Sequence, residues 1–225
     1  MPRKRETQGT AYKHRGTAKR HVGALKSRKL HKPKSRICSF IAHDRVSALR
    51  RNRSTLPERK VERMISEASF IDLALRSWKA NIDRADIFFD ALSEEELQRE
   101  VAPGKNRLIY LWGHLTAVND RMVAILGLGD RLHPELDAMF VSNPDKTVHL
   151  TLSPEKLKHL WDEVNERLWA AFCKLSPSDW MQKHAAVSEE DFVREPHRNR
   201  FSVLLGRTAH LAYHLGQAVL AKRES

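Results

Sequence analysis

The spacing of apolar residues is the feature of this sequence that most restricts its fold. Apolar side chains recur at steps of three and four residues through four segments, at about residues 66–92, 106–126, 153–175 and 200–221. This period is typical of amphipathic helices. No segment shows a persuasive alternation of apolar and polar residues, which is the pattern of a half-buried strand. We therefore predict an all-α fold, a four-helix bundle.

Local signals indicate where these helices begin and end. Ser93–Glu96 has the pattern of a capping box, and Ser153–Pro154 combines a capping serine with proline at the first helical position. Asn106 is the expected cap of the second helix, and Ser176–Pro177 marks the expected end of the third. The connection at 127–152 is long enough to be functional or to contain short structure of its own.

The charge of the chain is unevenly distributed. Its formal net charge is +12, but residues 1–63 hold 20 Lys and Arg against four acidic residues, a balance of +16. Residues 64–225 therefore carry a balance of −4. The first segment has no sustained apolar pattern, so we expect an arm that is disordered on its own, followed by one helical domain at 64–225.

Three interpretations of this basic arm remain open. It can be a tail that binds nucleic-acid phosphates without sequence preference. It can be a targeting peptide, because it is basic and poor in acidic residues. It can also be upstream sequence translated from a misassigned start, with Met64 as the true first residue, since globular patterning begins directly after Met64.

Composition excludes several classes of protein. No stretch approaches the ~20 apolar residues of a membrane span, and the first ten residues lack the apolar core of a secretory signal. The two cysteines are too few for a disulfide framework and form no CxxC pair. We predict a cytoplasmic protein with no membrane partner.

The last helical segment carries two histidines on an uncharged background. Thr208–Ala221 contains no charged residue, and a helix without a charged face is expected to be buried. His210 and His214 are one turn apart, so both imidazoles can reach one metal ion. The alternative is a pair of histidines that hydrogen-bond to neighbouring helices. Gln217 lies on the same face and is a candidate for orienting a ligand.

A third metal ligand would have to come from another helix. His114, at the edge of the apolar stripe of the second helix, is the candidate. Tyr110 and Tyr213 can line the same pocket, although packing explains them equally well. The remaining histidines of the domain lie in connections or among charged residues and are expected at the surface: His133, His149, His159, His184 and His197.

The sequence resembles the DinB/YfiT-like superfamily over about residues 66–222. The resemblance rests on His114 in the second helix and on the HLAYHLGQ segment from His210 to Gln217. It implies a bundle in which His114, His210 and His214 bind zinc, nickel or a similar divalent metal, with open positions for water or a ligand. Residues 1–63 have no counterpart in the family.

Members of this superfamily include S-transferases, which join low-molecular-weight thiols to electrophiles, and a thiol-dependent isomerase. The resemblance therefore implies a metal-dependent enzyme that acts on a small-molecule substrate with a thiol as cosubstrate; hydrolysis is a second reaction open to such a metal. No catalytic side chain is identified. The alternatives are a non-catalytic, stress-related metal-binding bundle and a nucleic-acid-associated protein that uses the arm. A homodimer is also left open.

Overall fold

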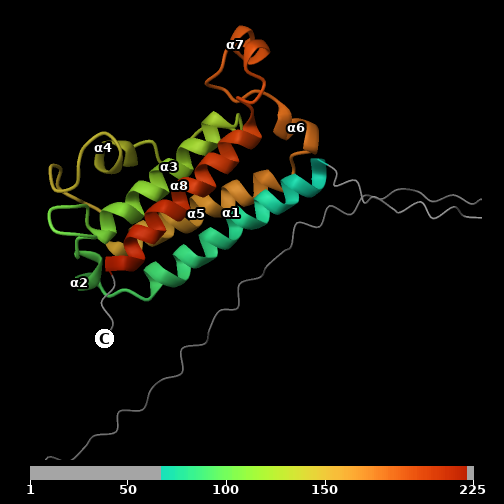
Figure 1. Ribbon diagram of the computed structural model, residues 1–225. Coiled ribbons are helices and arrows are strands. Elements are labelled where there is room, and N and C mark those ends of the chain that lie inside the picture. Colours follow the sequence, from blue (N-terminus) through green and yellow to red (C-terminus); the bar gives the residue numbers. More distant parts are fainter. Residues whose placement is uncertain (1–66, 222–225) are drawn as a thin grey trace, which may run out of the picture. The chain divides into compact units, whose positions relative to one another are not determined.

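The computed structural model describes residues 67–221. Four long helices dominate this part of the chain (Figure 1): α1 (Glu67–Asp90), α3 (Leu108–Ile125), α5 (Pro154–Phe172) and α8 (Arg200–Ala221). Residues 67–221 contain no strand, and the prediction of an all-α four-helix bundle is confirmed. The predictions for the basic arm and for Met64 fall outside the described residues.

Helix α3 is the central element of the bundle. It packs against α4, α5 and α8, and α1 packs against α8. Contacts on several sides explain why even Gly113, Asn119 and Asp120 of α3 are buried. The core between α1 and α5 contains aromatic rings, among them Trp78, which meets Phe172 edge to face at 5.1 Å between ring centres. No helix within residues 67–221 is long and apolar enough to cross a lipid bilayer.

Four short helices lie in the connections: α2 (Glu94–Leu97), α4 (Leu136–Phe140), α6 (Pro177–Met181) and α7 (Glu189–Arg194). Helix α4 is the short structure expected in the long connection at 127–152, and α2 is the short turn expected after Ser93. Such elements are too short to show a helical period of their own, and their stability comes from packing and caps.

The capping predictions are partly confirmed. Ser93 and Glu96 form the predicted capping box at α2, and the hydroxyl of Ser153 caps α5 with Pro154 in its first turn. The prediction for Asn106 is wrong: the residue at the N-cap of α3 is Arg107, which makes no side-chain cap. The carboxylate of Asp145 instead accepts a hydrogen bond from the backbone N–H of Arg107 at 2.7 Å.

The prediction for Ser176–Pro177 also needs correction. The helix α5 already ends at Phe172, and Ser176 caps α6, in which Pro177 occupies the first turn. The Ser-Pro pair therefore starts a helix and does not stop one, because proline is tolerated in the first turn, where its missing N–H has no partner to lose.

The expectation that α8 is buried on all sides is wrong. One side is buried through Leu204, Leu211, Leu215 and Ala218. The opposite side is apolar but exposed, as the exposed fractions of Tyr213 (62%) and Leu220 (86%) show. The absence of charged residues from Thr208–Ala221 therefore does not mean that the whole of α8 is buried. His210 and His214 lie between the two sides and are half-buried.

Candidate metal centre

Three imidazoles meet between α3 and α8, two helices that lie side by side and run in opposite directions (Figure 1). The Nε2 atom of His210 lies 3.3 Å from Nε2 of His114 and 3.2 Å from Nε2 of His214. All three side chains are half-buried. Among the described residues, this is the one cluster of three or more His, Cys, Asp or Glu side chains that could hold a metal ion.

The spacing of the three nitrogens fits a first-row metal. With metal–nitrogen bonds of about 2.0–2.1 Å and tetrahedral angles, two ligating nitrogens lie about 3.3–3.4 Å apart. The observed separations of 3.2 and 3.3 Å are close to that value. Because the donor set is three neutral nitrogens, it suits zinc, nickel or cobalt better than magnesium or calcium, which prefer oxygen.

Hydrogen bonds outside the cluster orient two of the imidazoles. Nδ1 of His114 lies 2.8 Å from the carbonyl oxygen of Phe140. This oxygen can only accept, so Nδ1 donates and Nε2 keeps its lone pair. Nδ1 of His214 lies 2.8 Å from Oε1 of Gln217, whose Nε2 donates to the hydroxyl of Tyr213 at 3.0 Å. The Nε2 lone pairs of His114 and His214 are thereby both directed at His210.

Three such nitrogens cannot satisfy one another. Nε2 of His210 has at most one proton to donate, and it faces two acceptors, on His114 and His214. One lone pair is left without a donor within the cluster. A divalent cation would accept all three lone pairs at once, and the outer hydrogen bonds are those that metal-binding histidines usually make.

Burial keeps the three imidazoles in the form that binds metal. It is the largest cause of the lowered pKa of His114 and His214. The pKa of His210 is lowered to about 4, first by burial and then by the neighbouring His214, His114 and Arg207. Since protonation would block ligation, neutral histidines at neutral pH favour metal binding.

Phe140 supports His114 through close packing against α3. Its ring lies against Gly113, the residue before His114, and is almost fully buried. A Cβ atom at position 113 would lie 2.3 Å from the ring, which no real contact allows. Glycine at this position therefore lets α4 approach α3 closely enough for the Phe140 carbonyl to reach His114.

Gly113→Ala should accordingly weaken both the fold and the site. We expect a loss of about 1–3 kcal/mol in the free energy of unfolding, typical of an overpacked core, and weaker metal binding because the Phe140 carbonyl must shift. Urea unfolding and competition with a chelator measure the two effects. The matched control is Gly206→Ala on α8, where an added Cβ meets nothing within 4 Å. Equal behaviour of the two variants would contradict this account.

A buried ion-pair network fixes the connection that leads to α4. Asp120 of α3 is fully buried and accepts hydrogen bonds from Nε of Arg131 at 2.9 Å and from the backbone N–H of Leu132 at 2.8 Å. Arg131 also binds Asp137 of α4. Arg131, followed by Arg121, lowers the pKa of Asp137 to about 2. The network thus ties α4 to α3 just before Phe140.

The structure places the remaining predicted residues as follows. The ring of Tyr110 stacks on His114 at 6.4 Å between ring centres, and its hydroxyl donates to the carbonyl of Asn143 at 2.7 Å. The ring of Tyr213 contacts His214 edge to face at 5.0 Å. Both tyrosines therefore touch the cluster. Gly113 and Phe140 could not be predicted from the sequence, because a contact between a ring, a glycine and a carbonyl leaves no recognisable motif.

The other histidines of the domain do not join the cluster. His149, His159 and His197 are exposed as predicted. The prediction of a solvated His133 is wrong, because its side chain is only 15% exposed and lies near Glu163, at 3.1 Å, and Glu135, at 3.4 Å.

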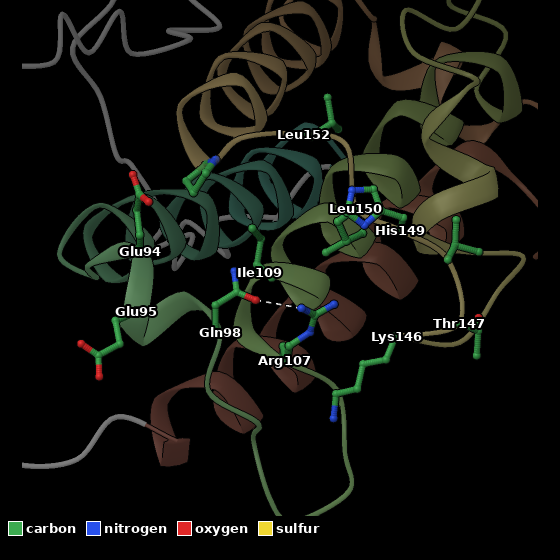
Figure 2. A pocket seen from close by; sticks show the side chains of 12 residues that line it. Glu94, Glu95, Gln98, Arg107, Ile109, Lys146, Thr147, His149, Leu150 and Leu152 are labelled. Carbon is green, nitrogen blue, oxygen red and sulfur yellow. Dashed lines mark hydrogen bonds between the residues drawn. The ribbon is translucent and has the colours of Figure 1, made fainter.

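An open cavity of about 750 Å³ lies elsewhere, between α2, the start of α3 and the connection before α5 (Figure 2). Its two basic lining residues, Arg107 and Lys146, are already engaged: Arg107 binds Asp145 and Gln98, and Lys146 binds Glu100. None of the three clustered histidines lines it. We therefore place the candidate site at the histidines and not at this cavity.

The fold and site define a helical bundle with a three-histidine centre between antiparallel helices. A sequence model of the DinB superfamily matches residues 77–218, which include all three histidines. The chain belongs to the DinB superfamily, as the resemblance predicts. A search of curated proteins finds no match to the chain.

Proposed function

We propose that His114, His210 and His214 bind one divalent metal ion, zinc or nickel, in a DinB-superfamily enzyme that joins a low-molecular-weight thiol to a small electrophile. The convergence of three Nε2 atoms, with separations of 3.2 and 3.3 Å between neighbours, carries this proposal. A bound metal of this kind lowers the pKa of a coordinated thiol or water towards neutrality. Three neutral ligands leave its charge uncompensated and a coordination position free, as in catalytic zinc sites.

The protein side chains then have orienting roles. The carbonyl of Phe140 holds the His114 ring, and Gln217 holds the His214 ring while Tyr213 fixes the amide of Gln217. Within hydrogen-bond distance of the three imidazoles, the described residues offer no carboxylate that could act as a general base. This suits thiol chemistry, because a thiol that has lost its proton to solvent needs no strong base in the protein.

Cobalt-substituted protein tests the thiol. Adding a small thiol should produce an intense sulfur-to-metal charge-transfer band, and the thiol should be consumed faster when an electrophile is present. Gln217→Ala should slow this reaction about 10–100-fold, the usual range for partners that orient a metal ligand, while most of the metal stays bound. The control is Gln182→Ala, an exposed glutamine that contacts none of the three histidines.

The outcomes separate the alternatives. A thiol that never reaches the metal, at a site where water still exchanges, would contradict thiol transfer and favour hydrolysis. A metal site without turnover of any electrophile would favour the non-catalytic bundle. A homodimer, a cytoplasmic location and nucleic-acid binding through residues 1–63 stay predictions from the sequence.

A further inference from the structure

Arg207 is a half-buried cation next to the histidine cluster. It lies on α8 three residues before His210, so the two side chains occupy the same face about one helical turn apart. No hydrogen bond or ion pair joins Arg207 to another residue within 67–221. The arginines at 107, 121 and 131, by contrast, all bind aspartates.

The charge of Arg207 acts on the site itself. It contributes to lowering the pKa of both His114 and His210. Arg121 adds a second positive charge: it lies two turns after His114 on α3, and its charge acts on both His114 and Arg207. The helices α3 and α8 run in opposite directions (Figure 1). Arg121 follows His114 on α3 and Arg207 precedes His210 on α8, so both arginines lie towards the same end of the bundle from the cluster.

Among residues 67–221, no acidic side chain pairs with Arg207. The groups that perturb His114, His210 and Arg207 are burial, the Phe140 carbonyl, the other histidines and the two arginines; no Asp or Glu is among them. Asp137 is close to Arg121 but is already shared with Arg131. A half-buried guanidinium without an acidic partner leaves its donors to water or to a ligand, and its planar fork matches a carboxylate.

We propose that Arg207 binds a carboxylate of the small molecule whose other end enters the free position of the metal centre. This inference rests on the proposed function and adds the substrate class: an anionic thiol or electrophile. Positions 207 and 210 are separated by about 4.5 Å along the helix axis, so the proposal calls for a small ligand, with its carboxylate only a few bonds from the atom that faces the metal. Arg207 is thus a residue that determines specificity, and the histidines remain the metal ligands.

A pair of matched thiols tests the inference on cobalt-loaded full-length protein. 3-Mercaptopropionate and its neutral amide, 3-mercaptopropionamide, have nearly the same size, and the charge-transfer band reports the Kd of each. We expect Arg207→Gln to weaken binding of the carboxylate about tenfold or more, the usual contribution of a charge-assisted hydrogen bond, and to leave binding of the amide unchanged. The two thiols differ in acidity, but each thiol is compared with itself across the protein variants, so this difference does not affect the result.

Three controls make the result specific. Arg84→Gln removes one positive charge from an exposed position on α1 and should not change either Kd. Arg207→Lys should retain part of the preference for the carboxylate, because it keeps the charge and loses the fork. Cobalt content should be equal in all variants, which shows that the centre is intact.

The possible failures are distinguishable. Suppose that both thiols bind and that Arg207→Gln prefers 3-mercaptopropionate over its amide as strongly as the unsubstituted protein does. The role of Arg207 is then refuted and the proposed function stands. If neither thiol reaches the cobalt, the proposed function fails, and calorimetric titration with malonate decides the anion site alone. Malonate binding that is tenfold weaker in Arg207→Gln than in Arg84→Gln supports the site, and equal binding overturns it.

Discussion

Replacing His210 and His214 together with alanine is expected to abolish metal binding. The protein should retain about one metal ion per chain after dialysis against buffer, and the double variant should retain none. The physical reason is that a single remaining imidazole, His114, cannot hold a divalent ion against dilution, since structural and catalytic zinc sites need three or four protein ligands. Elemental analysis of the dialysed proteins measures the effect directly.

The control for this experiment is a variant that replaces a histidine outside the cluster. His197→Ala removes an exposed histidine outside the cluster and should keep a full equivalent of metal. Helical content should survive in both variants, because His210 and His214 are half-buried at the side of α8 and alanine is a good helix former. A full equivalent of metal in the double variant would refute the site.

The helical architecture was readable from the sequence because its signals are local. Each long helix buries one stripe, and that stripe recurs with the period of the helix itself. Caps are local as well: the hydroxyls of Ser93 and Ser153 satisfy backbone N–H groups three residues away. Asn106 failed as a cap because a distant carboxylate, that of Asp145, takes over the start of α3.

The cluster was readable only in part, for a similar reason. The spacing of His210 and His214 lies within one helix, so the sequence alone places them together. His114 joins them only through the packing of α3 on α8, so the sequence could offer it as a candidate from its place at the edge of an apolar stripe but could not bring it to the other two. The support for His114 depends on contacts between residues far apart in sequence, which include the Phe140 carbonyl and the pairing of Arg131 with Asp120.

The uncharged stretch Thr208–Ala221 shows the limit of reasoning from composition. It predicted burial of the whole helix, yet Tyr213 and Leu220 are exposed. Which side of a helix is covered depends on the neighbouring helices, and the period of α8 does not contain that information. What the stretch does indicate correctly is that the polar side of this helix does not carry the charges of an ordinary solvated face. Its polar side chains at the cluster, His210, His214 and Gln217, are all neutral hydrogen-bonding groups.

Asp120→Ala should have the largest effect on stability of any single substitution considered. The carboxylate is completely buried and accepts hydrogen bonds from Arg131 and from two backbone N–H groups, those of Leu132 and His133. Removing it leaves buried donors without partners, and breaking a buried ion pair from one side usually costs about 3–5 kcal/mol. Urea unfolding followed by tryptophan fluorescence measures the loss.

A nearby aspartate is the matched control. Asp130 lies in the connection that follows α3 and is exposed, and Asp130→Ala should change the free energy of unfolding by no more than about 0.5 kcal/mol. Arg131→Ala should fall between the two, because Asp120 keeps its backbone donors while Asp137 keeps Arg121. If Asp120→Ala and Asp130→Ala unfold alike, the network does not stabilise the fold.

The same substitution should also reach the metal centre, because the network ties α4 to α3 and the last residue of α4 orients His114. Asp120→Ala is therefore expected to lower metal affinity even though Asp120 contacts none of the three histidines. A metal that binds only the folded chain stabilises it by mass action, and that stabilisation should be smaller in Asp120→Ala than in Asp130→Ala at the same metal concentration. An equal gain on adding metal would mean that α4 keeps its position without the network, so that the packing of Phe140 against Gly113 alone positions the carbonyl.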